Sequence, residues 1–336
     1  MKNTHDHLNP NPLTDPLLPV IQARALITAV QIGLFEAVGL EGSSLEVLTG
    51  KLSMDRPGLG KVLNLLCAMG YLGHSGDSYH LTDVAEKTLL PGSPFCFTGW
   101  IEFCTLQHKV IAGLEDVLRS GRPVDMRDLL STPESRRIHQ RGMADTARPA
   151  APRVAQQIPV REGAKRVLDI GGSHGLYSAA LCRKYPGMKG DVLELSPTFE
   201  EAREIARQEG TLDVVSHIEG DILSVGLEEP YDVVFLGNLV HHFSPDQNRS
   251  IFQKIAAALT PGGTVAVWDI RDSGTEEDIT AASFSLFFYL TSGASCYSLD
   301  EIKTWLKEAG FSDILIHNQA GSGSTHVLIT GRRTET

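Results

Sequence analysis

The chain has 336 residues, of which 42% are hydrophobic and 21% are charged, so it is long enough for roughly two domains with ample cores. Its 41 acidic and 30 basic residues give a formal net charge of −11, so the average surface repels nucleic acids. No Cys-x-x-Cys pair and no apolar run of about 18 residues, long enough to span a membrane, is present. These features indicate a reduced, cytoplasmic protein without a structural metal and without a membrane or nucleic-acid partner.

Residues 1–19 are polar and rich in proline, which predicts a loose arm. From Val20 to Val38, apolar residues recur at helical spacing but are too numerous for a helix that packs on one face only. We therefore expect this helix to be buried against a partner subunit.

Residues 44–48 and 56–69 predict two short helices, and residues 71–72 and 79–81 predict the two strands of a hairpin. A helix, a turn, a helix and a two-stranded wing form a winged helix, which we assign to residues 20–95. The candidate recognition helix has only two basic residues, Arg56 and Lys61, which are too few to bind along the phosphate backbone of DNA. We expect a dimerisation or lid domain, with a ligand-sensing DNA-binding regulator as the least favoured alternative.

A second helical region follows, and we assign residues 96–160 to a linker that can also form the roof of a ligand pocket. Aromatic, histidine and methionine side chains are spaced along it, including Phe103, His139 and Met143. Such residues belong to a helical core more often than to a ligand site, so both interpretations stay open.

From Gly163 onward, strands alternate with helices, which is typical of a parallel sheet with crossover connections. The pattern predicts seven strands, at residues 166–170, 191–195, 214–219, 232–236, 264–269, 313–317 and 327–330. Ligands of open α/β sheets bind at the carboxyl ends of the strands. We therefore assign residues 161–336 to the ligand-binding domain and expect the functional residues at the strand ends.

The first two strands end in an acidic residue each. Asp169 is followed by Gly171, Gly172 and Gly175, a turn that exposes backbone N–H groups at the start of the next helix. Glu194 lies nineteen residues beyond Gly175, where a carboxylate can accept hydrogen bonds from two ribose hydroxyls.

The third strand leads into Glu219, Gly220, Asp221 and Ile222. An acid here can accept a hydrogen bond from an exocyclic amine while the aliphatic neighbour packs on a flat ring. Three acids would then surround one nucleoside without a nearby basic residue. This charge pattern disfavours the pyrophosphate of a dinucleotide and favours a cationic nucleoside without phosphate.

The stretch Asp169-x-Gly171-Gly172-x-x-Gly175, followed by Glu194 and by Asp221, resembles the class I methyltransferases that bind S-adenosylmethionine. With the winged helix and the segment Asn238-Leu-Val-His-His-Phe, it is similar to the small-molecule O-methyltransferases of the acetylserotonin, caffeate and bacterial polyketide type, from about Val20 to Arg332. The resemblance implies an α/β, Rossmann-like seven-stranded sheet, a homodimer formed through the N-terminal domain, no metal, and S-adenosylhomocysteine as product. It also implies cofactor contacts from Asp169, Gly171, Gly172, Gly175, Glu194, Leu195, Gly220, Asp221, Ile222, Asn238 and Leu239.

His241 aligns with the general base of this family, which removes the proton of a phenol or enol hydroxyl as the oxygen attacks the methyl group. Asp269 corresponds to a flanking glutamate that orients the base. His242 and Phe243 replace the Asp-Trp pair of plant members.

The chain departs from the family pattern at several positions. The second flanking glutamate corresponds to Cys296, and the middle glycine of the loop is Ser173. The Phe-x-x-x-Met substrate contact of the family corresponds to residues 139–143, where His139 replaces the phenylalanine and Met143 is retained. A run of aromatic residues at 284–289 is either pocket lining or a core helix. The implied substrate contacts are Phe103, His139, Met143, His242, Phe288 and Cys296.

These features predict a metal-independent methyltransferase that forms a methyl ether on an apolar, aromatic hydroxylated small molecule of secondary metabolism. The substitution at Cys296 keeps a second hypothesis open. In that hypothesis, a methyltransferase-fold enzyme uses the charge of the bound cofactor for hydroxylation, decarboxylation or pericyclic cyclisation without methyl transfer.

Overall fold

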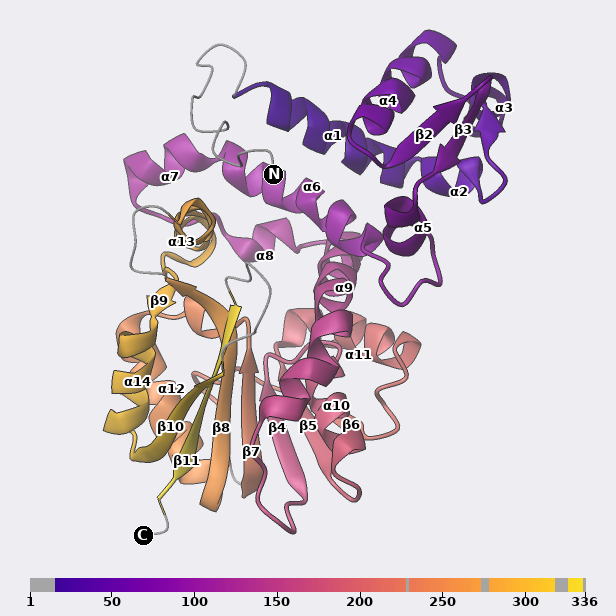
Figure 1. Cartoon of the computed structure of the whole chain (residues 1–336). Coiled ribbons are helices and arrows are strands. Elements are labelled where there is room, and N and C mark those ends of the chain that lie inside the picture. Colours follow the sequence, from indigo (N-terminus) through magenta and orange to yellow (C-terminus); the bar gives the residue numbers. More distant parts are fainter. Residues whose placement is uncertain (1–15, 228–229, 273–277, 318–325, 335–336) are drawn as a thin grey trace, which may run out of the picture. The chain divides into compact units, whose positions relative to one another are not determined.

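The computed structural model describes residues 16–227, 230–272, 278–317 and 326–334 (Figure 1). Most of the predicted N-terminal arm lies outside these residues. The chain divides into two compact units, residues 1–105 and residues 106–336, and helix α6 (Thr98–Ala112) contains the boundary. The four-part division predicted from the sequence (1–19, 20–95, 96–160 and 161–336) stays a prediction.

The first unit packs short helices around a small antiparallel sheet in the order β1-β3-β2. Its elements are α1 (Leu18–Gln31), α2 (Leu34–Val38), β1 (Ser43–Ser44), α3 (Leu45–Leu52), α4 (Arg56–Ala68), β2 (Leu72–Ser75), β3 (Ser78–Leu81) and α5 (Asp83–Leu89). The Ser44 hydroxyl accepts from an amide in the first turn of α3, and the Asp55 carboxylate does the same for α4. Two capped helices followed by a hairpin are consistent with the predicted winged helix.

The second unit contains an eight-stranded sheet whose main path is β10-β11-β8-β7-β4-β5-β6. Its strands are β4 (Arg166–Ile170), β5 (Lys189–Glu194), β6 (Val215–Glu219), β7 (Tyr231–Gly237), β8 (Leu259–Asp272), β9 (Tyr297–Ser298), β10 (Phe311–His317) and β11 (His326–Arg333). The expected seven strands are all present, but the expected number is wrong because β9 pairs with the end of β8. Two residues directly before a helix cap are too short to produce a recognisable pattern. The sheet is also mixed, since β11 pairs antiparallel with both of its neighbours.

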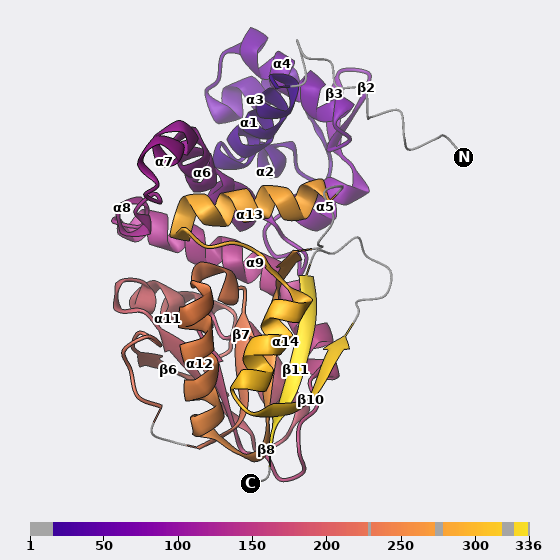
Figure 2. The same ribbon diagram turned by 90° about the vertical axis from the view of Figure 1, so that its left-hand side faces the viewer.

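Helices cover both faces of this sheet (Figures 1 and 2). They are α9 (Pro133–Gln157), α10 (Leu176–Lys184) and α11 (Phe199–Gln208) on one face and α12 (Pro245–Ala258) and α14 (Leu299–Glu308) on the other. Shorter or peripheral elements are α7 (Leu114–Ser120), α8 (Met126–Leu129), η1 (Ser196–Thr198), η2 (Val240–His242) and α13 (Ile279–Ser292).

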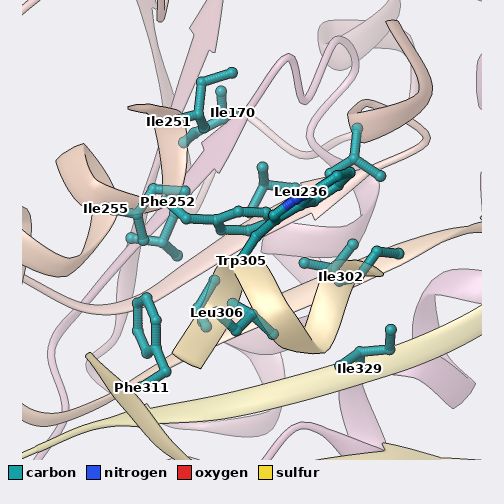
Figure 3. Close-up of a cluster of buried hydrophobic side chains, with 14 of the residues drawn as sticks. Ile170, Leu236, Ile251, Phe252, Ile255, Ile302, Trp305, Leu306, Phe311 and Ile329 are labelled. Carbon is teal, nitrogen blue, oxygen red and sulfur yellow. The ribbon is translucent and has the colours of Figure 1, made fainter. Parts of the chain in front are cut away.

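The core beneath α14 shows how the sequence holds these layers together (Figure 3). Three side chains lie on one face of α14 because of their helical spacing, namely Ile302, Trp305 and Leu306. This face is turned toward the sheet, and each of the three is at most 2% exposed. Trp305 packs among side chains that include Leu236 of β7 and Phe252 of α12. This packing, worth about 1.5–3 kcal/mol per large apolar side chain, fixes the strands whose carboxyl ends carry the candidate site.

Candidate active site

A cavity of about 400 Å³ lies at the carboxyl ends of the central strands of the second unit. All of the predicted cofactor contacts except Gly175 line it. So do three of the predicted substrate contacts, His139, Met143 and His242. The strand ends therefore bring together residues that are up to about a hundred positions apart in the sequence.

The glycine loop between β4 and α10 bends sharply over the side chain of Asp169. Gly171 has a φ of 66°, a left-handed conformation that favours glycine. A Cβ atom on Gly172 would lie 2.3 Å from Cγ of Asp169, so this position has no room for a side chain. Gly175 lies outside the cavity lining, and a Cβ atom there would lie 3.1 Å from Val215 and 3.2 Å from Val192. Its small size lets α10 approach the sheet.

Asp169 lines the cavity although it is only 1% exposed. Burial raises the pKa of its carboxyl to about 7, and hydrogen bonds from Ser178 oppose that shift. Within the described parts of the chain, its Oδ2 atom has no hydrogen-bond partner. A buried oxygen of this kind is a site for a donor group of a ligand.

Glu194 is held firmly by its own neighbours. Its Oε2 atom accepts from the Ser173 amide at 3.0 Å, and its Oε1 atom accepts from the Leu195 amide at 3.1 Å and the Thr198 hydroxyl at 2.6 Å. Burial raises the pKa of Glu194, and these hydrogen bonds oppose the shift. The carboxylate has about four lone-pair sites, so capacity for a further donor remains.

Asp221 starts the loop after β6, and its Oδ1 atom accepts from the Leu223 amide at 2.9 Å. Lys254 of α12 fixes the same loop by donating from Nζ to the carbonyl oxygens of Ile222 and Leu223, both at 2.8 Å. Lys254 itself does not line the cavity. The loop is thus anchored from outside, while its acidic side chain borders the cavity.

The charges of the cavity wall fit a cationic nucleoside. Asp169, Glu194 and Asp221 are carboxylic acids, and none of the described residues that line the cavity is a lysine or an arginine. The partnerless oxygen of Asp169 and the glycine loop that lacks room for side chains add a donor site and a close backbone approach. The residues present therefore fit S-adenosylmethionine, which carries an ammonium and a sulfonium group and no phosphate.

His241 in η2 and Asp269 near the carboxyl end of β8 are hydrogen-bonded to each other. The His241 Nδ1 atom and the Asp269 Oδ1 atom are 2.5 Å apart, and both side chains are at most 4% exposed. Asp269 Oδ2 also accepts from the amides of Leu239 and Val240, each at 2.9 Å. Burial alone would raise the pKa of Asp269, but its interactions with His241 and the amide of Ile270 hold it below its usual value. An ionised Asp269 accepts a hydrogen bond from Nδ1–H of His241 and so leaves Nε2 as the hydrogen-bond acceptor.

His241 lies behind the cavity wall and not on it. Its ring stacks on Phe288 of α13, with centroids 3.6 Å apart and planes 12° apart. The ring of His242, which does line the cavity, is 4.3 Å from that of His241.

Three predicted substrate contacts are not on the cavity wall. Phe103 belongs to the first unit, where it is buried edge-on to Trp100. Phe288 and Cys296 form an apolar cluster with Ile270. Burial raises the pKa of the Cys296 thiol to about 11, so it stays protonated near neutral pH and does not supply the negative charge of a glutamate.

The glycine loop contacts α9, and the sequence does not predict this contact. The Ser173 hydroxyl donates to Oε1 of Gln140, and both residues are buried and line the cavity. The Ser173 carbonyl also lies 2.7 Å from Nε2 of His217. Ser173 has a φ of 51°, unusual for a residue with a side chain. The only signal in the sequence was a serine where the resemblance implies a glycine.

No group of three or more His, Cys, Asp or Glu side chains in the described residues is arranged to hold a metal ion. Across the same residues, no helix combines the length and the apolar character needed to cross a membrane.

Comparisons with known proteins add independent information. A family model described as an O-methyltransferase domain matches residues 121–312, more than half of the chain. A 3-hydroxy-5-methyl-1-naphthoate 3-O-methyltransferase of Streptomyces sahachiroi is 25% identical over 330 residues, which cover 95% of this chain and 94% of the relative. Aclacinomycin 10-hydroxylase RdmB of Streptomyces purpurascens is 30% identical over 165 residues, which cover 48% of this chain and 41% of the relative.

Among solved structures, human N-acetylserotonin methyltransferase in complex with S-adenosylmethionine superposes with a TM-score of 0.85 at 16% identity, covering 96% of each chain. This likeness shows that the two proteins share a fold. The match of the family model begins directly after α7 and ends at the start of β10, and it includes the glycine loop and the His241–Asp269 pair. The chain therefore belongs to the S-adenosylmethionine-dependent O-methyltransferase family.

Proposed function

We propose that the protein transfers the methyl group of S-adenosylmethionine to a hydroxyl of an apolar, aromatic small molecule of secondary metabolism, with His241 as general base. The observation that carries this proposal is the buried hydrogen bond of 2.5 Å between His241 and Asp269, directly behind the cavity wall. The cofactor supplies an electrophilic methyl group on a cationic sulfur, so no metal is needed to activate it.

The cofactor contacts that we propose are Gly171 and Gly172 of the glycine loop together with Asp169, Glu194 and Asp221. Their support is the acidic cavity wall, in which the described residues include no lysine or arginine. Gly220, Leu195, Ile222, Asn238 and Leu239 also line the cavity and complete the proposed set.

Asp269 acts as the positioning residue of the base. Because Asp269 accepts a hydrogen bond from Nδ1–H of His241, the Nε2 atom is the one that takes the proton of the acceptor hydroxyl. The imidazole is covered by Phe288, so we expect this part of the wall to move when the acceptor binds. Active-site distances often become short only in the complex with substrate.

The apolar part of the wall supports an aromatic acceptor. It includes Met126, Leu130, Met143 and Phe243. Flexible methionines adapt to flat ring systems, and phenylalanine packs against them. The relative from S. sahachiroi is named for a compound with a hydroxylated naphthalene ring, which supports an aromatic acceptor.

The test is an assay with methyl-labelled cofactor and a panel of hydroxynaphthalenes. Wild-type protein should form labelled methyl ethers, and a His241→Ala variant should lose at least about a hundredfold in kcat, since a positioned base contributes roughly 10²–10⁴. His317→Ala provides a matched control, because this histidine of β10 pairs with Thr330 away from the cavity lining. Unchanged turnover in the His241 variant would rule out its role as base.

We also propose that the protein is a homodimer formed through the winged helix of the first unit. The support is the apolar surface of α1, where Leu18, Val20 and Ile21 are 45–59% exposed. Light scattering after size-exclusion chromatography should give the mass of a dimer, and a Val20→Glu, Ile21→Glu double variant should give a monomer. A wild-type monomer at micromolar concentration would contradict this proposal.

A second candidate function is cofactor-assisted chemistry without methyl transfer, such as hydroxylation. It is favoured by the partial similarity to a 10-hydroxylase and by the neutral thiol of Cys296, which removes one acidic partner that the resemblance implies for the base. Product mass separates the two functions. Methyl transfer yields a methylated product and one S-adenosylhomocysteine per turnover, whereas the alternative leaves the cofactor intact.

A further inference from the structure

Two imidazoles lie on the cavity wall away from the acidic residues of β5 and β6. His242 follows β7 and His139 lies on α9, and they are close enough for His139 to influence the titration of His242. The strand order is β7-β4-β5-β6, with neighbouring strands about 4.8 Å apart, so the turn after β7 lies roughly 14 Å from the loop that carries Asp221. The cavity therefore has an imidazole side and a carboxylate side.

Both imidazoles are uncharged around neutral pH. Burial lowers the pKa of His139 to about 4. His242 is an exposed residue that lines the cavity; desolvation by the protein atoms around its ring lowers its pKa to about 3, and His241 adds to this shift. A neutral imidazole presents one N–H donor and one nitrogen acceptor. Within the described parts of the chain, the His242 ring makes no hydrogen bond, so its polar atoms are available to a ligand.

The charge of the wall determines which polar group fits there. An acidic acceptor would bring another negative charge into a cavity bordered by Asp169, Glu194 and Asp221, where no lysine or arginine of the described lining can pair with it. A neutral hydroxyl or carbonyl oxygen carries no such penalty and finds a donor or an acceptor on a neutral imidazole.

We propose that His242 and His139 recognise a second, uncharged oxygen of the acceptor, next to the hydroxyl that is methylated. The ring centroids of His241 and His242 are 4.3 Å apart, so an acceptor that reaches both rings presents its two oxygens at neighbouring positions of one ring system. The substrate class is therefore a neutral aromatic compound with two adjacent or peri oxygen substituents, such as a dihydroxyarene or a hydroxyquinone. This inference rests on the proposed function and specifies its acceptor.

Three compounds with the same ring system separate the possibilities: 1-naphthol, 1,8-dihydroxynaphthalene and 1-hydroxy-2-naphthoate. Dissociation constants are measured by calorimetry on the full-length protein saturated with S-adenosylhomocysteine, and methyl transfer to each compound is measured separately. The variants are His242→Phe, which removes the polar atoms, and His242→Gln, which keeps a donor and an acceptor. His139→Phe and His139→Gln form a second pair, and His317→Gln is the control outside the cavity.

Wild-type protein should bind the dihydroxy compound about tenfold or more tightly than either of the others, because only this compound offers a neutral second oxygen to the imidazoles. His242→Phe should reduce this preference to less than about threefold, and His242→Gln should restore most of it. Preference for the naphthoate, or an unchanged preference in both phenylalanine variants, would overturn the inference. Because binding is read without turnover, tight and selective binding without methyl transfer would refute the proposed function and leave the recognition site supported.

Discussion

Replacement of Asp269 by asparagine tests the central feature of the site, because the change keeps the shape of the side chain and alters only its charge and one hydrogen-bonding atom. The Asp269 carboxylate accepts from Nδ1 of His241 at 2.5 Å and from the amides of Leu239 and Val240 at 2.9 Å. If the asparagine oxygen keeps the two amides, its NH₂ group faces Nδ1. The imidazole must then carry its proton on Nε2, the atom that has to accept one.

The size of the effect follows from this change of tautomer. A correctly oriented general base contributes roughly 10²–10⁴ to the rate, so kcat should fall by at least about a hundredfold. The pKa of Asp269 is held below its usual value, so its ionised form stabilises the fold above the pKa of an unfolded aspartate, and that stabilisation is lost as the pH falls through the folded pKa. Loss of the buried ionic hydrogen bond should also cost about 1–3 kcal/mol of unfolding free energy near neutral pH.

The assay combines kcat with labelled cofactor, the dissociation constant of S-adenosylmethionine by calorimetry, and thermal unfolding. Asp232→Asn is a matched control: Asp232 is also buried, accepts from the amides of Lys165 and Arg166, and lies at the opposite end of β7 from the cavity. Both variants should be destabilised, but only Asp269→Asn should lose kcat. A folded Asp269→Asn protein with kcat within about threefold of wild type would refute the reasoning.

Three further predictions concern the glycine loop. Because burial raises the pKa of Asp169 to about 7, S-adenosylmethionine should bind more tightly at about pH 8 than at about pH 6 in calorimetry. Asp169→Asn should remove this pH dependence and stabilise the ligand-free protein by about 1–4 kcal/mol at high pH. Equal affinities of the wild type at both pH values would contradict this prediction. Gly172→Ala should weaken cofactor binding by about tenfold or more, because the new Cβ atom would lie 2.3 Å from Cγ of Asp169. Gly50→Ala in α3 is the control and should leave the affinity unchanged, because a Cβ atom there meets nothing within 4 Å. Equal affinities in the two variants would exclude a steric effect at Gly172. Ser173→Gly relieves the left-handed φ of 51° but removes the hydroxyl that contacts Gln140 of α9. The KM of the acceptor should therefore rise by about tenfold, while the affinity for the cofactor stays within about threefold of the wild type. An unaltered acceptor KM would show that this contact does not position α9.

Local signals predicted the framework of the site well. The strand at 166–170 and the glycine turn after it depend on residues that are neighbours in the chain, and β4 has the expected bounds. The caps of α12 and α14 are equally local, because the hydroxyls of Ser244 and Ser298 form capping boxes with residues three positions further along the chain. The rule that ligands bind at the carboxyl ends of the strands then placed most of the expected cofactor contacts on one cavity.

Contacts between segments that are far apart in the sequence could not be predicted from local sequence patterns. The stacking of Phe288 on His241 joins residues 47 positions apart, and nothing in either local sequence indicates it. The strand β9 was missed because two residues carry no periodicity. The hydrogen bond between Ser173 and Gln140 depends on how α9 packs, and a glutamine inside a helix gives no signal of its own.

The acidic wall connects binding to turnover under the proposed function. Asp169 and Glu194 both have pKa values raised by burial, so their ionised forms are disfavoured in the ligand-free protein and a bound cation relieves this strain. S-adenosylmethionine carries a positive sulfur, whereas S-adenosylhomocysteine does not. A positive sulfur within about 4 Å of one of these carboxylates would gain at most about 4 kcal/mol at an effective dielectric of about 20. The acidic wall would then hold the methyl donor more strongly than the product, which would favour exchange of one for the other after each methyl transfer.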